Sequence, residues 1–308
     1  MNVDLNRLRQ LRSQRFDPTV ARPRESYFNE YTGRAFESGN VAERFHENTK
    51  LTRQSEFQLG PAAGTFTGDP SLGYAQARLQ PDHADADLVD LPPTDGLDDR
   101  FDTVVVTRRS RRAMSGEGIS LQDLSTLLQH ACGVTGKDVV GETGDGHDDV
   151  EKPFRAYASA GGLYPVEAYV AVVNEGADLP RGLYYYVPEE HAVRVLDRDP
   201  DVVDRVDDVI SIPRDVHDPT DAAVSVFLTG AFWRAMAKYG PRGYRFVLQE
   251  SGHLAQNLQL AANAVGLASV PLAAFYDDEA NDLLGVDGVN EAAVYSISVG
   301  QLDHGGDP

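Results

Sequence analysis

The stretch TRRSRRAM, residues 107–114, places four arginines around Ser110 in a chain whose formal net charge is −20. Guanidinium groups bind phosphate oxygens in pairs, and a serine hydroxyl adds a further donor. Because such closely spaced arginines repel one another, we expect a bound anion, a phosphate in the first place, to offset their charge. The alternative is a basic turn that faces solvent, as most charge runs do.

Two further stretches carry residues that suit a ligand site. YASAGGLYPVEAYV, residues 157–170, is a loop of small residues that leads into a strand. Without bulky Cβ groups, a flat ligand or a phosphate can approach the backbone of such a loop closely. The other stretch, residues 238–278, begins with Lys238 and Tyr239 and ends just after an apolar run.

Helices and strands must position these segments. Apolar spacing predicts a helix over 121–131, with Ser120 as N-cap and Gly133 as its end, and a long helix over 244–265 that Gly266 closes. Shorter patterns predict further helices at 231–239 and 277–285, strands at 166–173, 221–230 and 292–300, and a hairpin from 182–187 and 191–196. Helices and hairpins are mixed rather than strictly alternating, so the predicted fold class is α+β.

Residues 79–100 are rich in aspartate and proline and show no apolar periodicity, which is typical of a linker. We therefore expect an N-terminal arm and acidic linker over 1–96, the main domain over 97–303, and a tail over 304–308.

Composition limits the partners. A pI near 4.7 argues against nucleic acid, because a polyanion is repelled, and the arginine-rich residues 1–34 are interpreted as an arm on an acidic body. No apolar run is long enough to span a bilayer and the N-terminus is too polar for a secretory signal, so we expect a cytoplasmic protein with no membrane partner. The single Cys132 predicts a buried thiol, and the acidic residues of 144–152 predict a solvated loop rather than a metal site.

In order and spacing, the motifs in 107–114, 157–170 and 238–278 resemble the SagB-type dehydrogenase branch of the FMN-dependent nitroreductase superfamily. That branch includes the thiazoline and oxazoline oxidases of peptide natural-product pathways. The resemblance spans about residues 97–301, and AERFHENTKL at 42–51 resembles a motif often found ahead of that domain.

The resemblance implies a nitroreductase-like fold, a central mixed or antiparallel sheet flanked by helices, and it implies bound FMN. It assigns Arg108 and Ser110 to the FMN phosphate, with help from Arg109, and Arg112 to the N1/O2 edge of the flavin. A fixed cation at that edge favours the reduced flavin, which carries negative charge at N1 and O2.

By the same resemblance, Ser159, Ala160 and Gly161 form the loop that contacts FMN from the neighbouring subunit, which implies a homodimer with FMN at its interface. The segment whose backbone N–H groups face flavin N5 and O4 corresponds to Pro271, Leu272, Ala273 and Ala274. Two departures from the family are the missing glycine at Ala273 or Ala274 and the absence of basic residues at 301–303, after the last strand.

Lys238 and Tyr239 match a Lys-Tyr pair that azoline-oxidising members of the family use in catalysis. Dehydrogenation needs a base that takes a proton while hydride leaves, and a Tyr or Lys whose pKa is lowered can be that base. Because a helix C-terminus stabilises positive charge, we expect Lys238 to stay protonated and Tyr239 to be the base. The alternative is that both side chains are simply exposed at a helix end.

The sequence thus predicts an FMN-dependent oxidoreductase that dehydrogenates an azoline-like small molecule or peptide by hydride transfer to flavin N5. Two alternatives stay open. One is an NAD(P)H-dependent nitro or quinone reductase on the same fold, and the other is a non-catalytic flavin-binding partner in a peptide-modifying complex.

Overall fold

The computed structural model describes residues 41–51, 56–69, 72–73, 75, 83, 85–94, 96–140, 150–176, 178–199 and 201–303. The arginine-rich residues 1–34, the acidic residues 144–149 and the tail at 304–308 lie outside these ranges. Two compact units divide the chain between Thr52 and Arg53. The described part of the first unit contains helix α3 (Val41–Asn48), which carries most of the AERFHENTKL motif.

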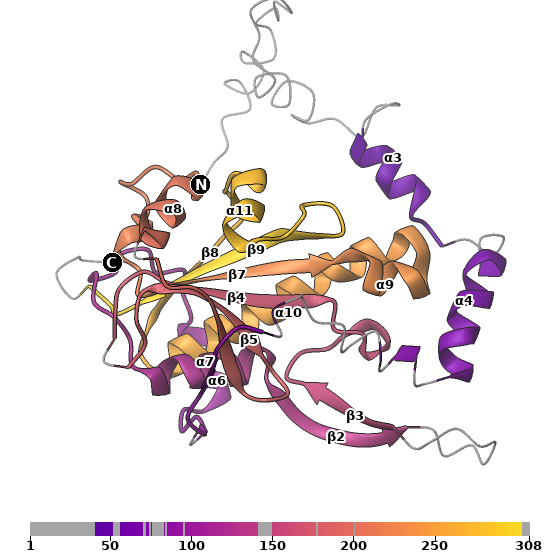
Figure 1. Ribbon diagram of the computed structural model, residues 1–308, viewed down its shortest axis with the longest axis horizontal. Coiled ribbons are helices and arrows are strands. Elements are labelled where there is room, and N and C mark those ends of the chain that lie inside the picture. The colour runs from indigo at the N-terminus through magenta and orange to yellow at the C-terminus, as the bar shows by residue number, and fades with distance from the viewer. Residues whose placement is uncertain are drawn as a thin grey trace, which may run out of the picture. The chain divides into compact units, whose positions relative to one another are not determined.

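The second unit is built on an antiparallel sheet with the strand order β1-β6-β5-β4-β7-β9-β8 (Figure 1). The strands are β1 (Leu88–Asp90), β4 (Val166–Val172), β5 (Gly182–Val187), β6 (Ala192–Asp197), β7 (Val224–Ala231), β8 (Ala268–Leu272) and β9 (Glu291–Gly300). Every residue of the central strands β4 and β7 is buried. Both strands are rich in apolar residues on both faces, which requires a cover on each side of the sheet.

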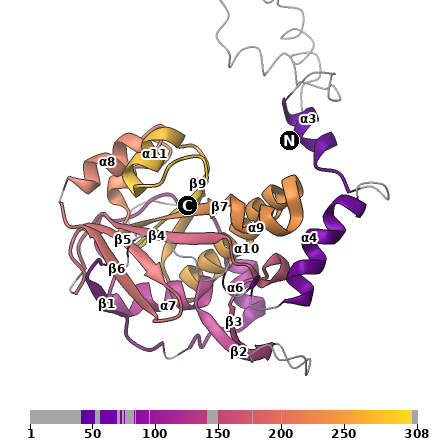
Figure 2. The same cartoon turned by 45° about the vertical axis from the view of Figure 1, so that its right-hand side comes forward.

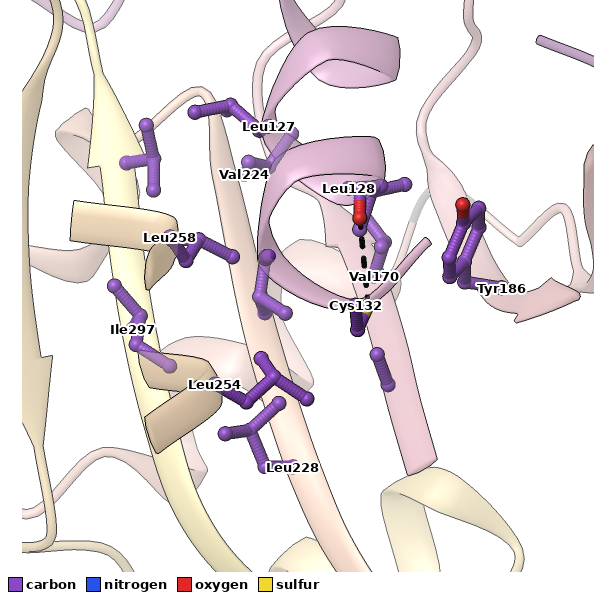
Figure 3. Close-up of a cluster of buried hydrophobic side chains, with 14 of the residues drawn as sticks. Leu127, Leu128, Cys132, Val170, Tyr186, Val224, Leu228, Leu254, Leu258 and Ile297 are labelled. Atoms are coloured by element: carbon purple, nitrogen blue, oxygen red, sulfur yellow. Dashed lines mark hydrogen bonds between the residues drawn. The ribbon is translucent and has the colours of Figure 1, made fainter. Parts of the chain in front are cut away.

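Helices provide that cover. On one face, α7 (Leu121–Cys132) and α10 (Gly243–Ala264) pack leucines against Val170, Val224 and Ile297 of the sheet (Figure 3). On the other face, α8 (Val202–Val209) and α11 (Asp277–Leu284) pack against the side chains that point the opposite way, among them Tyr169 and Phe227. The predicted α+β class and the nitroreductase-like arrangement of an antiparallel sheet between helices are confirmed.

Local signals mark the helix ends as expected. Ser120 and Asp123 form a capping box at the start of α7, with the Ser120 hydroxyl accepting from the Asp123 N–H at 3.0 Å. Gly133 caps the other end. Cys132 is buried, and burial raises the pKa of its thiol to about 12, so it is an inert core residue.

The segment expected to be a linker contributes to the sheet. Residues 88–90 form β1, which pairs with β6, and Leu91 is buried. A strand of three residues is too short to show apolar periodicity in the sequence. It forms because it pairs with the edge of β6.

The remaining elements lie around the sheet and its covering helices. They are α4 (Glu56–Gly68), α6 (Phe101–Thr107), β2 (Val134–Val140), β3 (Val150–Arg155), α9 (Phe232–Tyr239) and the short turns η1 (Ala160–Gly162), η2 (Pro219–Asp221) and η3 (Gly240–Arg242). Helix α4 lies beside α9 (Figure 2). No helix of the described residues is long and apolar enough to cross a membrane.

Candidate functional site

The glycine loop, residues 159–162, lies directly against Lys238 and Tyr239, the Lys-Tyr pair. A Cβ atom placed on Gly161 would be 2.7 Å from the Tyr239 hydroxyl oxygen and 2.8 Å from Lys238 Nζ. Gly161 also has φ 67°, a backbone conformation that side chains other than glycine rarely adopt. The structure therefore brings together two motifs that are far apart in sequence, and only a glycine allows their close approach.

Two charged side chains hold this loop. Glu250 of α10 accepts a hydrogen bond from the Ala160 N–H at 2.9 Å, and Lys152 of β3 donates to the Gly161 carbonyl at 2.9 Å. Within the loop, the Ser159 hydroxyl accepts from the Tyr164 N–H at 2.8 Å. The Ala160–Gly161 dipeptide is thus held at the Ala160 N–H and at the Gly161 carbonyl.

Helix α10 continues this row of contacts. His253 bonds to the Ala158 carbonyl through Nδ1 at 3.3 Å, and Asn257 donates to the Ala156 carbonyl at 3.1 Å. With Glu250, these residues lie three and four positions apart, on one face of the helix. Hydrogen bonds to backbone carbonyls give both residues structural roles.

Farther along the same helix, one amide holds the arginine segment, residues 108–112, and another holds helix α6, which precedes it. Arg108 donates to the Gln259 side chain at 3.2 Å, and Asn263 donates to the Val104 carbonyl at 3.1 Å. Glu250 and Gln259 are about 14 Å apart along the helix axis at the rise of an α-helix. Helix α10 therefore positions the arginine segment and the glycine loop at a fixed spacing.

The arginine segment follows α6 as an extended chain that runs beside β8. The Arg111 N–H donates to the Ser269 carbonyl at 3.0 Å. Arg108 and Ser110 are half-buried, whereas Arg109 and Arg112 are exposed. The Arg109 guanidinium also donates to two backbone carbonyls, and the Arg112 carbonyl contacts His217 Nδ1 at 3.0 Å. These contacts fix the segment, while the exposed guanidinium groups of Arg111 and Arg112 remain available to an anion.

The segment of Pro271 to Ala274 begins at the end of β8. Leu272 points into the core, whereas Ala273 and Ala274 are exposed. Among the described residues, no acceptor takes a hydrogen bond from the backbone N–H of Ala273 or Ala274. Strand β8 thus joins the arginine segment to two exposed backbone donors, and together they form the first group of site residues. The second group lies around the glycine loop and contains Lys238 and Tyr239.

Burial sets the protonation of the second group. It lowers the pKa of Lys238 and raises the pKa of Tyr239, which the carboxylate of Glu250 raises further. Burial also lowers the pKa of Lys152, with a further contribution from the charge of Lys238. The expectation that Tyr239 has the lowered pKa is wrong, because desolvation outweighs the helix terminus and acts oppositely on an acid and on an amine.

Glu250 and Lys152 were not predicted from the sequence. Glu250 is 3 % exposed, and burial raises its pKa to about 7. Its signal is visible in retrospect, since it interrupts the apolar stripe of α10 between Val247 and Leu254. Lys152 lies beside an acidic stretch on a strand that the sequence did not reveal, and it carries no comparable signal.

A buried ionic network supports the end of the glycine loop. The Glu167 carboxylate on β4 pairs with Arg234 at 2.5 Å and accepts a hydrogen bond from Tyr185 at 3.0 Å. Arg234 also donates to the Tyr164 carbonyl at 2.8 Å, at a residue held at φ 46°. The network ties the loop to the central strand and to α9.

Comparison with known proteins agrees with this architecture. The Nitroreductase family matches residues 105–301. MJ1384 of Methanocaldococcus jannaschii is 33 % identical over 189 residues, which cover 61 % of this chain and 85 % of that protein. The trifolitoxin-processing protein TfxB of Rhizobium leguminosarum bv. trifolii is 28 % identical over 200 residues, which are 64 % of this chain but only 50 % of TfxB.

A solved structure shows the same fold. In the Escherichia coli microcin synthetase McbBCD complex with truncated pro-MccB17, one chain aligns with a TM-score of 0.52 and 16 % identity, over 82 % of this chain and 98 % of that one. The match to the family extends from the arginine segment to the end of β9 and includes both groups of site residues. The chain belongs to the nitroreductase family.

Proposed function

We propose that this nitroreductase-family oxidoreductase binds FMN and dehydrogenates an azoline-like ring in a peptide or small molecule. The observation that carries the proposal is the contact of Gly161 with Lys238 and Tyr239, which joins a small-residue loop to an amine with a lowered pKa. Such an amine is suited to remove a proton beside a flat ligand.

The residues present fit FMN. The arginine segment offers charge-assisted donors and the Ser110 hydroxyl for a phosphate, and Ala273 and Ala274 offer exposed N–H groups for the polar edge of a flavin. Arg112 supplies the cation for the N1/O2 edge. When bound, FMN supplies the acceptor for hydride at its N5 atom.

Lys238 and Tyr239 have different roles in the proposed reaction. We assign proton removal to Lys238, because its lowered pKa increases the fraction of free amine. Tyr239, whose pKa is raised, keeps its proton and donates a hydrogen bond that orients the substrate. The glycine loop brings its backbone close to both groups, and the half-buried surroundings exclude part of the water.

A site shared between two subunits suits the spacing along α10. The arginine segment contacts that helix at Gln259, whereas the loop beside the Lys-Tyr pair contacts it at Glu250. The proposal therefore includes a homodimer in which Ser159, Ala160 and Gly161 of one subunit complete the FMN site of the other. The peptide class of substrate is supported by the similarity to TfxB, which is named for trifolitoxin processing.

The experiment is anaerobic reduction of the purified flavoprotein, followed by absorbance of the bound flavin. We expect an azoline-containing peptide to bleach the flavin and NADH or NADPH to leave it oxidised. Bleaching by the nicotinamides but not by the peptide would replace this proposal with a nitro or quinone reductase. Bleaching by neither, in protein that dithionite still reduces, would leave a flavin-binding partner without dehydrogenase activity.

A further inference from the structure

Lys152 and Lys238 approach the same pair of glycines. A Cβ on Gly161 would lie 2.8 Å from Lys238 Nζ, and a Cβ on the next residue, Gly162, would lie 2.5 Å from Lys152 Nζ. The Lys152 ammonium is fixed there by its hydrogen bond to the Gly161 carbonyl. Two amines from different elements, β3 and α9, thus meet at one turn of the backbone.

Neither amine has a neutralising partner in the described part of the chain, where no carboxylate lies within ion-pair distance of Lys152 or Lys238. Both side chains are half-buried, so solvent screens their repulsion only in part. Like charges this close disfavour each other, and the effect is mutual. Burial and then the charge of Lys238 lower the pKa of Lys152, whereas burial lowers the pKa of Lys238. Because the repulsion is mutual, a positive charge at position 152 also disfavours a charged Lys238.

Other groups around Lys238 act differently. Tyr239 on the same helix stays neutral because burial raises its pKa, and α4 adds the uncharged ring of Phe66, whose centroid is 5.8 Å from Lys238 Nζ. Glu250 on α10 acts on the neighbouring Tyr239, whose pKa its charge raises further. Lys152 is the cation that shares a backbone contact with Lys238.

We propose that Lys152 is a positioning residue of this site, which holds the Gly161 carbonyl and, through its own charge, favours the uncharged amine of Lys238. The use of that amine as the base rests on the proposed function, whereas the coupling of the two lysines does not. The hydrogen bond from Lys152 Nζ to the Gly161 carbonyl fixes the position of this amine beside Lys238.

The test compares two substitutions that differ in permanent charge. Lys152→Arg keeps a positive charge at all accessible pH values, and Lys152→Gln removes it. Trace acetylation with acetic anhydride across a pH series, read by peptide mass spectrometry, gives the midpoint at which Lys238 becomes reactive, since only the free amine reacts. We expect that midpoint to be about one pH unit lower in Lys152→Arg than in Lys152→Gln.

Lys137 provides the matched control, because it lies on the paired strand β2 and forms an exposed ion pair with Glu151. Lys137→Arg and Lys137→Gln should give the same Lys238 midpoint. Equal midpoints in the two Lys152 variants, or an equal difference in the two Lys137 variants, would overturn the proposal. The labelling needs no substrate, so its failure is separate from a failure of the azoline peptide to reduce the flavin.

Discussion

Glu250 accepts a hydrogen bond from the backbone N–H of Ala160 across 2.9 Å, although 90 residues separate them in the chain. The carboxyl is almost completely buried, and its pKa is raised to about 7. The residue that holds the glycine loop is therefore also a group that titrates near neutral pH.

That titration predicts a pH-dependent stability. The pKa of Glu250 rises from 4.5 to about 7 on folding, so the folded state binds the proton more tightly. Stability from this group is complete below pH 4.5 and falls as pH rises to about 7, by on the order of 3 kcal/mol in total. Glu250→Gln keeps an acceptor for Ala160 and removes the ionisation.

Urea unfolding at pH 5 and pH 8 checks this. We expect Glu250→Gln to gain stability relative to the wild type at pH 8 and to change little at pH 5. A constant difference between the two proteins across this range would show that Glu250 does not titrate there.

The arginine segment should retain the cofactor. Arg108→Ala together with Ser110→Ala removes charge-assisted contacts worth on the order of 1.5 to 3 kcal/mol each, so FMN affinity should fall by roughly 10² to 10⁴-fold. Flavin content after gel filtration and fluorescence titration measure the loss. Arg205→Ala is the control, because Arg205 pairs with Asp197 on the far side of the sheet from α10. Full flavin occupancy in the double variant would contradict the assignment.

Lys238 should act as the base. Lys238→Met and Lys238→Arg both lack a free amine, and each should slow flavin reduction by the substrate by about 10² to 10⁴-fold. Tyr239→Phe removes one hydrogen bond and should cost only about tenfold. In the wild type, the rate should rise with pH and level off above the lowered pKa of Lys238.

Stopped-flow reduction by dithionite is the comparison, since it requires no protein base. It should be unchanged in all three variants. Equal slowing with dithionite would mean that the pair only packs beside the flavin. A larger loss of the substrate-driven reduction rate in Tyr239→Phe than in Lys238→Met would identify the tyrosine as the base.

Glu167 should be essential for stability. It is 1 % exposed, and its removal leaves Arg234 buried without its carboxylate. Glu167→Ala should therefore lower the free energy of unfolding by roughly 3 to 5 kcal/mol. Glu151→Ala, which breaks only an exposed pair with Lys137, should cost less than about 1 kcal/mol. Similar losses in the two variants, measured by denaturant unfolding, would argue against a stabilising role for the buried network.

The proposed homodimer can be measured directly. An interface that completes two FMN sites should bury more than about 2,000 Å² and persist at low protein concentration. Multi-angle light scattering with flavin quantification should give two chains and two FMN. A monomer that still holds one FMN per chain would disprove the shared site.

The helices and strands whose signals are local can be predicted from the sequence alone. Ser120 and Gly133 delimit α7 by capping chemistry, and the apolar runs of β4 and β7 predict strands that are buried on both faces. The order of the arginine, glycine-loop and Lys-Tyr motifs was enough to indicate the family, because each motif is continuous in the chain.

How these motifs meet depends on contacts between distant parts of the chain. Strand β1 exists because β6 offers it an edge, and Lys152 and Glu250 join the glycine loop across long stretches of chain. The pKa shifts of Lys238 and Tyr239 likewise come from desolvation, a property of the packed surroundings rather than of the residue or its helix position. Long-range pairing and the desolvation of a single polar side chain leave no periodic signal in a sequence, which is why the directions of these two pKa shifts could not be predicted from it.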